Sequence, residues 1–389
     1  MGSPSGQYSR LYFRKEAVPG TFAVFSAVAG LKLYQEEFQP RPTKTPIRYQ
    51  ENKGGVIFDN PDFTPGPQGV TGTLRFALRY SGVHAVMLGH ALGQMGTTGP
   101  SGSPPQYTHA ADGGPGTPSL PGRYNSLSFL HQRPINDAGT TFKQTELIGA
   151  KIGRMRLTQS VGQPFIICEM DIVAQEARYN TTATSPAALP PDTGTGFAPH
   201  ESLVQASHVV GASGNNFSFQ SRLGTTPGTE VFPRLEEWTL ELNNFPEQLG
   251  VISNINRQSN PARGQVREVT GSWVVEQDAS TDQIEAAFGL AASDPSAEIA
   301  MAWSFENPAQ IQEDMVIQVS SAYITQPERG TTGTGPQRRR YNFTAHGAGP
   351  NGNWPAAYPL KVTIKSLIEL PPSSADGPKY GDHVTGAGG

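Results

Sequence analysis

The sequence predicts an all-β fold with two short helices, arranged as two similar tandem β domains. Apolar residues make up 36% and charged residues 16% of the 389 residues, while glycine (44) and proline (34) supply about a fifth of the chain. This composition is typical of short strands joined by many turns. Apolar and polar residues often alternate, whereas strong helix signals are scarce. The same order of elements also occurs twice along the chain.

Each half opens with a Pro-Gly-Thr turn, a strand and a long polar loop. In the first half the turn starts at Pro19, the strand ends at Phe38 and the loop covers residues 39–65. In the second half the strand ends at Phe245 and the loop covers residues 246–264. The order of the three elements is therefore the same in both halves.

A Val-Thr-Gly strand and a short helix come next in both halves. VTGTLRFALRY starts at Val70 and VTGSWVVEQD starts at Val269. One side of each alternation is apolar and the other is polar, as expected of half-buried strands. Ser81 and Ser280 are suited to cap the helices that follow, and Gly93 is suited to end the first.

Three further strands complete each half. YNSLSFLHQRP, ELIGAKIGRMRLT and FIICEMDIVAQ in the first half correspond to EIAMAWSFENP, DMVIQVSSAYIT and LKVTIKSLIEL in the second. The shared order indicates a tandem duplication, with domains at 1–190 and 191–370 and a C-terminal tail at 371–389. Long inserts rich in glycine and proline, of a length that is usually functional or disordered, lie at 94–123 and 328–359.

Charge, cysteine content and hydropathy exclude several classes of protein. The formal charge of −4 provides no basic field for tight binding of nucleic acid. The one basic run, 338–340, is interpreted as a solvated loop or as a contact with an acidic partner. Cys168, the only cysteine, alternates in phase with apolar neighbours and is expected to be buried. No apolar stretch suits a membrane anchor or a signal segment, so we expect synthesis in the cytosol.

The residue patterns contain no recognisable site for catalysis. The eight histidines are scattered, without the spacing of metal ligands, and neither a nucleophile elbow nor a Walker loop is present. GAGPNG at Gly347 matches a dinucleotide motif, but Pro355 and Pro359 follow where a helix should begin. We expect no catalytic residue, metal or cofactor. A hydrolase built from dispersed acidic residues remains an alternative.

The chain resembles the tail tube proteins of long-tailed (siphovirus-type) bacteriophages, in a tandem-duplicated form. The resemblance is carried by RKEAVPGT, LEEWTLELNNFPEQL, REVTGSWVVEQDASTDQIEAAF and FKQTELIGAKIGRMRLTQSVGQPFIICEMDIVAQEA, and it extends in pattern over residues 12–370. It implies β-sandwich domains whose sheets join between subunits into a channel-lining barrel. Single-domain members form hexameric rings, so three chains of two domains would form a trimeric ring, and stacked rings would form the channel that conducts DNA.

The resemblance also implies partners and a location. The expected partners are further copies of the chain, the tape measure protein, the tail terminator and the distal tail proteins, with phage DNA passing through without specific binding. The protein would belong to the virion tail and assemble in the host cytoplasm, without catalysis. The alternative is a two-domain β-sandwich adhesin or carbohydrate-binding module of a virion. The four tryptophans fall mostly inside strand patterns, which favours packing over an exposed sugar platform.

Two sets of site residues follow from the resemblance. In the family the long loop reaches the adjacent ring, so inter-ring contacts are expected from Arg41, Lys44, Arg48, Arg257 and Arg263. The polar sides of the Val-Thr-Gly strands are candidates for lining the channel, through Thr71, Thr73, Thr270, Ser272, Glu276 and Asp278. Arg75 and Arg79 make the first of these strands basic, which is unfavourable for passing DNA without binding it.

Overall fold

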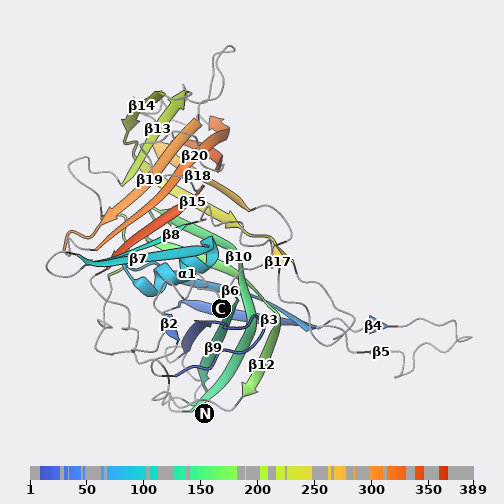
Figure 1. Cartoon of the computed structure of the whole chain (residues 1–389). Coiled ribbons are helices and arrows are strands. Elements are labelled where there is room, and N and C mark those ends of the chain that lie inside the picture. Colours follow the sequence, from blue (N-terminus) through green and yellow to red (C-terminus); the bar gives the residue numbers. More distant parts are fainter. Residues whose placement is uncertain are drawn as a thin grey trace, which may run out of the picture.

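A computed structural model shows a mostly antiparallel β protein in which the described residues include one complete α-helix (Figure 1). The structure describes residues 9–26, 30–33, 35–44, 47–48, 63–64, 68–101, 106–112, 126–136, 141–181, 189, 202–208, 216–223, 226–247, 262–263, 267–276, 284, 298–309, 313–329, 338–345 and 359–366. The predicted all-β class is confirmed. Of the second predicted helix only Ile284, which is helical and buried, lies among the described residues.

The N-terminal half contains the complete helix and the longest strand among the described residues. Its elements are β1 (Arg10–Lys15), β2 (Leu31–Leu33), β3 (Glu37–Lys44), β4 (Ile47–Arg48), β5 (Phe63–Thr64), β6 (Gln68–Ala77), α1 (Gly82–Leu92), β7 (Gln94–Ser101), β8 (Gln106–Asp112), β9 (Leu127–Pro134), β10 (Phe142–Ser160), β11 (Gln163–Ala174) and β12 (Glu176–Thr181).

The C-terminal half is built from strands in a similar order. They are β13 (Phe217–Leu223), β14 (Thr226–Val231), β15 (Leu235–Asn243), β16 (Pro246–Glu247), β17 (Ala262–Arg263), β18 (Glu268–Glu276), β19 (Glu298–Glu306), β20 (Asp314–Arg329), β21 (Arg338–Ala345) and β22 (Lys361–Ser366).

One long strand organises the pairing in each half. The first part of β10 pairs with β9 and β12, and β9 continues to β1 and β2; the last part of β10 pairs with β11, which continues to β6 and β3. The first part of β20 likewise pairs with β19 and β22, and β19 continues to β13 and β14; the last part pairs with β21, which continues to β18 and β15. The two halves therefore have the same pairing order.

The correspondence between the halves extends to single residues. Gly72 of β6 and Gly271 of β18 hold the same place in the two Val-Thr-Gly strands. Two strands away from these glycines, Ile152 of β10 and Ile324 of β20 occupy equivalent positions. Each isoleucine is followed at once by a register shift, which leaves one extra residue in the long strand.

The structure corrects three details of the predicted order. The strand expected to end at Phe38 is instead two strands, β2 and β3, and β3 occupies the start of the predicted loop 39–65. The counterpart of FIICEMDIVAQ is β21, which lies inside the predicted insert 328–359, whereas LKVTIKSLIEL contains β22, the counterpart of β12. Prolines in β3 and consecutive arginines in β21 explain why the sequence pattern indicated loops.

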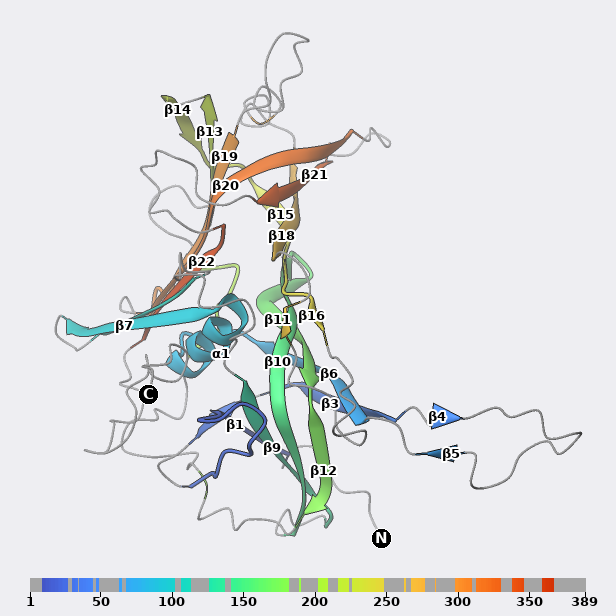
Figure 2. The same cartoon turned by 45° about the vertical axis from the view of Figure 1, so that its right-hand side comes forward.

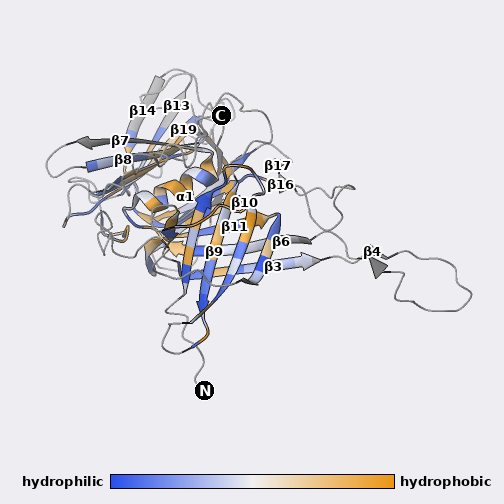
Figure 3. Ribbon diagram, turned by 60° about the horizontal axis from the view of Figure 1, so that its bottom comes forward, coloured by the Kyte–Doolittle hydropathy of each residue, from blue (hydrophilic) through white to orange (hydrophobic). Residues whose placement is uncertain are grey.

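A continuous apolar core links the two halves. Figure 3 shows hydrophobic and hydrophilic residues alternating along β9, β10 and β11, which places one face of each strand in the core. All residues of α1 are buried, consistent with a helix that is apolar on most sides. The Ser81 Oγ accepts a hydrogen bond from the Val83 backbone N–H, and Gly93 ends the helix at a φ of 117°. Both predicted ends of this helix are confirmed.

In the C-terminal half the core is aromatic, because Trp238, Trp273 and Trp303 are fully or almost fully buried among neighbouring rings. The tryptophan prediction is confirmed for these three residues, while Trp354 lies outside the described residues. Cys168 is buried and free of a disulfide, as predicted.

One hairpin crosses from the first half to the second. β7 pairs with β8, and β8 in turn pairs with β22 over Tyr107–Asp112. Figure 1 shows β7 and β8 beside α1 and below β20. The predicted insert 94–123 therefore contains ordered strands that extend the sheet of the other half. Within the described residues, no helix has the length and hydropathy needed to cross a membrane.

Candidate self-assembly interface

The two halves of the chain are joined by a β-ladder between β10 and β15. The ladder runs antiparallel from Arg154, opposite Asn243, to Ser160, opposite Glu237. Directly beyond its end, the Asn244 backbone N–H donates to the Gly153 carbonyl oxygen at 2.8 Å. The even-numbered residues of β15 therefore direct their backbone hydrogen bonds towards β10, because N–H groups alternate in direction along a strand.

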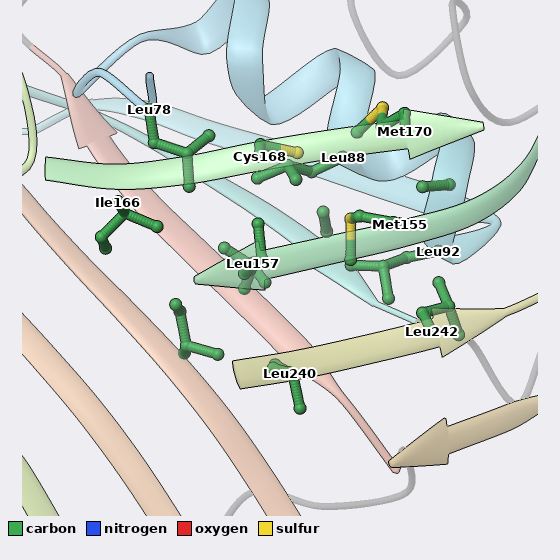
Figure 4. Packing of buried hydrophobic residues seen from close by; sticks show 14 of the residues in the cluster. Leu78, Leu88, Leu92, Met155, Leu157, Ile166, Cys168, Met170, Leu240 and Leu242 are labelled. Atoms are coloured by element: carbon green, nitrogen blue, oxygen red, sulfur yellow. The ribbon is translucent and has the colours of Figure 1, made fainter. Parts of the chain in front are cut away.

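Apolar side chains continue across this junction without a gap. Met155 and Leu157 of β10 lie beside Leu240 and Leu242 of β15, and all four are fully buried. Figure 4 shows them in one layer with residues of β11 and α1. Full burial of such a side chain contributes roughly 1.5–3 kcal/mol. The junction is therefore part of the protein core.

A polar cluster at the end of α1 locks the same junction. Asn244 donates through Nδ2 to the carbonyl oxygens of Ala91, at 2.8 Å, and Ile152, at 3.1 Å. Arg267 donates through Nε to Asn244 Oδ1 at 2.9 Å and through Nη1 to the Leu92 carbonyl oxygen. Two residues of the C-terminal half thus complete the C-terminal end of a helix in the N-terminal half.

Burial affects the chemistry of this cluster. Desolvation lowers the pKa of Arg267 to about 10. The guanidinium stays charged at neutral pH because this value still lies well above 7. Its position at the negative end of the helix dipole favours the charged form. Sequence patterns provided no signal for Asn244 or Arg267, because both act through contacts distant in sequence.

A second buried polar contact fixes the other end of the ladder. Trp238 donates through Nε1 to Gln159 Oε1 at 2.9 Å, and Gln159 donates through Nε2 to the Pro164 carbonyl oxygen at 2.8 Å. Trp238 and Gln159 also lie directly opposite each other in the ladder. The register between the halves is therefore specified by side chains at both ends and by apolar packing between them.

The face of this sheet opposite the core carries charges of both signs. Arg154 lies 2.8 Å from Asp171 of β11 and 3.9 Å from Glu241 of β15. Arg156 is in register with Glu169 on one side and with Glu241 on the other. Basic residues of β10 therefore lie between acidic residues of both neighbouring strands, and neither sign dominates the centre of the face.

The described channel candidates share this face. Thr71 and Thr73 of β6 are exposed, and Thr270, Ser272 and Glu276 of β18 are half-buried, each out of phase with the buried residues of its strand. Asp278 lies outside the described residues.

Arg75, the basic residue of β6, faces acidic partners, whereas Arg79 lies beyond the end of the strand and bridges to Leu203. Arg75 is in register with Glu169 and its Nε lies 3.2 Å from Glu36 Oε2. The predicted basic character of this strand is thus offset by neighbouring carboxylates.

The described residues predicted for inter-ring contacts lie on strands. Arg41 and Lys44 belong to β3, whose ladder with β6 spans Glu37–Lys44. Arg48 lies in β4, which pairs with β5, and Arg263 lies in β17, which pairs with β16. Figures 1 and 2 both show β4 and β5 far from the rest of the chain. Arg257 lies outside the described residues.

Two strand edges lack a partner among the described residues. The free edge of β3 lies opposite its ladder with β6, and the end of β20, Ile324–Arg329, has ladder pairs with β21 alone, whereas Ala322 also pairs with Ile299 of β19. These edges are the counterparts of the two that form the β10–β15 ladder. An exposed edge is a template for pairing with another chain.

One buried carboxylate, that of Glu16, is held by hydrogen bonds within the fold. Glu16 accepts hydrogen bonds from Ser126, Ser128 and the backbone N–H groups of Gly20 and Gly149. This cluster joins the end of β1 to β9 and β10. No group of three or more histidine, cysteine, aspartate or glutamate residues suited to a metal occurs in the described part of the chain.

Two comparisons found proteins that are similar to this chain. A family model described as phage tail tube protein matches residues 6–347. A solved structure, the tail of an empty GTA particle computed with helical refinement in C6 symmetry, is similar at a TM-score of 0.25 and 16% identity, covering 34% of this chain and 92% of that one. The search of curated proteins found no match.

Proposed function

This chain belongs to the family of phage tail tube proteins, and we propose that three copies of it form a ring that stacks with other rings into the DNA-conducting tube of a tail. The chain is a structural protein of the virion tail. We assign it no catalytic role.

The single observation that carries the proposal is the relation between the β10–β15 ladder and the two unpartnered edges. Within one chain, an edge of the first half joins an edge of the second half. The counterpart edges, on β3 and on the end of β20, are left for neighbouring copies. The two edges are unlike, so the contact is head-to-tail and generates a ring if the rotation closes.

The number three follows from treating the halves as tandem tail-tube domains, at 1–190 and 191–370. Equal pairing orders support this division, because each half then supplies the same set of sheet strands. If the ring has the sixfold arrangement of single-domain members, three chains provide its six domains. Joining the edges also removes the aggregation hazard of an open sheet.

The polar face of the joined sheet would line the channel. The candidates on it are Thr71, Thr73, Thr270, Ser272, Glu276 and Asp278. Interspersed charges of both signs suit the passage of DNA, because a uniformly basic surface would bind phosphates by releasing counterions. The tape measure protein, the tail terminator and the distal tail proteins are the further partners that this function implies.

The hairpins based on β4–β5 and β16–β17 are suited to contact the next ring. Each is a two-residue ladder at the base of a long connection, and the first lies away from the body of the chain (Figure 2). Arg48, Arg257 and Arg263 would supply basic groups for carboxylates of the adjacent ring, whereas Arg41 and Lys44 lie on β3, the edge proposed to meet a neighbouring copy in the same ring. The proposed function also implies that the tube assembles in the host cytoplasm.

The competing hypothesis is an adhesin or carbohydrate-binding module. Sugar binders usually present exposed aromatic rings, but Trp238, Trp273 and Trp303 are buried in this structure. Electron microscopy of the purified full chain, combined with its mass in solution, tests the proposal. We expect rings or tubes with a central hole and a trimeric mass. A chain that stays monomeric at high concentration would overturn it.

A further inference from the structure

We infer that the ring closes through a defined ladder in which β3 of a second copy pairs with the last part of β20, in the register of the β10–β15 ladder and with Arg41 opposite Glu328. The inference rests on the proposed ring and specifies which residues of two neighbouring copies lie opposite each other. It identifies the partner as a second copy of this chain.

The register follows from corresponding residues. Ile152 and Ile324 occupy equivalent positions, and counting on from them makes Arg156 of β10 the counterpart of Glu328 of β20. On the other strand, Leu240 lies opposite Gly271 and Pro40 lies opposite Gly72.

Glu241, the residue after Leu240, is thus the counterpart of Arg41 on β3. Since Arg156 and Glu241 are directly opposite within the chain, Glu328 and Arg41 would be directly opposite between chains.

Charge complementarity supports this register. Within the chain a basic residue of β10 lies opposite an acidic residue of β15. In the inferred ladder the acidic residue belongs to β20 and the basic residue to β3, so both signs are exchanged and the pair remains opposite in charge. Arg41 is exposed in the single chain, where its Nη2 donates to Gln39 Oε1 at 3.3 Å, and its other guanidinium nitrogens would serve such a contact. Opposite charges that face each other across strands stabilise pairing, whereas like charges destabilise it.

Prolines make this ladder weaker than the one inside the chain. The β3–β6 ladder has no register shift although it contains Pro40 and Pro42. Proline has no N–H to donate, so the nitrogens of both residues face the free edge of β3. Their counterparts, Leu240 and Leu242, direct their N–H groups to β10. The seam between copies therefore lacks donors that the seam within the chain has.

A proline of β20 strengthens this conclusion. Pro327 of β20 is the counterpart of Met155, which lies opposite Leu242. In the inferred ladder Pro327 would face Pro42, and neither could donate. Edge prolines also protect a free chain from pairing with wrong strands. The inferred seam is thus selective, because complementary side chains must provide the stabilisation that the missing backbone hydrogen bonds do not.

Cysteine cross-linking of assembled full-length protein tests the register. Arg41→Cys with Glu328→Cys places two thiols directly opposite at a position without mutual backbone bonds, where side chains lie closest. After oxidation we expect covalent dimers and trimers on a non-reducing gel. The matched control, Arg156→Cys with Glu241→Cys, is the equivalent pair inside the chain and should leave a monomer.

An off-register control shows whether the contact is specific. Arg41→Cys with Gln326→Cys shifts one thiol by two residues, to a diagonal separation of about 7–8 Å that disfavours a disulfide. Equal cross-linking of both pairs, or none in rings that form normally, would overturn the inferred register while leaving the ring intact. Absence of rings for the unmodified chain would instead overturn the proposed function.

Charge exchange provides a second measurement if the cysteine variants fail to assemble. Arg41→Glu and Glu328→Arg each create a like-charged pair, and each should weaken assembly by about two- to fivefold per seam, as expected of an exposed ion pair. The double variant restores opposite charges and should recover assembly. Additive losses in the double variant would contradict the inference.

Discussion

The Nε of Arg267 donates to Oδ1 of Asn244 at 2.9 Å, and through this pair the C-terminal half completes a helix that belongs to the N-terminal half. The amide of Asn244 contacts carbonyl oxygens of α1 and β10, while the guanidinium reaches the last residue of the helix. These contacts hold the β10–β15 ladder in place, which is the arrangement that the ring would repeat between copies.

Removing the buried guanidinium should destabilise the chain. Arg267→Met keeps much of the side-chain volume but leaves the Leu92 carbonyl and the Asn244 amide oxygen without their donor. We expect a loss of about 2–4 kcal/mol in the free energy of unfolding, measured with urea. The control is Arg178→Met, because Arg178 forms an exposed pair with Glu176. A loss of equal size in both variants would contradict the role of the cluster.

A methyl group at Gly271 should not be tolerated. A Cβ there would lie 2.5 Å from the Thr239 carbonyl oxygen and 2.4 Å from the ring of Phe343. Gly271→Ala should therefore lower the melting temperature, at a cost of about 1–3 kcal/mol for forced overpacking. Gly162→Ala is the control, since a Cβ at that position would meet nothing within 4 Å. Similar melting temperatures for both variants would refute the close approach of β15 and β18.

Restoring a backbone donor on the free edge of β3 should increase self-association. Pro42→Leu adds the N–H that its counterpart Leu242 has, so we expect larger assemblies at a given concentration, or aggregation, in light scattering. Thr43→Leu is the matched control, because its N–H already faces β6: it adds apolar bulk and removes the hydroxyl that donates to the Gly69 carbonyl oxygen, but it adds no donor on the free edge. If both variants associate equally, the added donor is not the cause.

Stability should fall in mild acid because three buried histidines resist protonation. Burial lowers the pKa of His84 to about 3 and those of His109 and His131 to about 4. The unfolded chain takes up protons near the usual pKa of 6.5, so the folded state loses stability as pH falls from about 6.5 towards 4.

The slope is about 1.4 kcal/mol per pH unit for each histidine, and urea unfolding at several pH values measures it. His109 contacts Ser366 through Nε2 at 3.1 Å, so His109→Gln keeps a polar contact while removing the titration. That variant should have a shallower slope between pH 6 and 4.5. An unchanged slope would show that His109 does not contribute.

Local patterns predicted much of the N-terminal half. Alternation indicated β6 and β11, and Ser81 and Gly93 marked the ends of α1, because these signals depend on neighbours in sequence. The sequence pattern did not indicate β3, because Pro40 and Pro42 are compatible with a strand only where their nitrogens face an unpaired edge, and the sequence does not show which strands lie at an edge. It failed for β21 because the arginine run 338–340 resembles a solvated loop.

The interface could not be predicted residue by residue. Asn244 and Arg267 are ordinary polar residues in the sequence, and only the three-dimensional fold brings them to the end of α1. The hairpin β7–β8 was predicted as an insert, but its pairing with β22 depends on a strand more than 240 residues later. Long-range pairing of this kind leaves no trace in local periodicity.

The dependence of α1 and β8 on later residues has a consequence for synthesis. When the ribosome has made only the first half, the end of α1 lacks Arg267 and Asn244, and β8 has no β22 to pair with. The nascent chain therefore exposes apolar surface and an unpaired strand until residues 361–366 have been synthesised, the period in which chaperones would protect it from premature association.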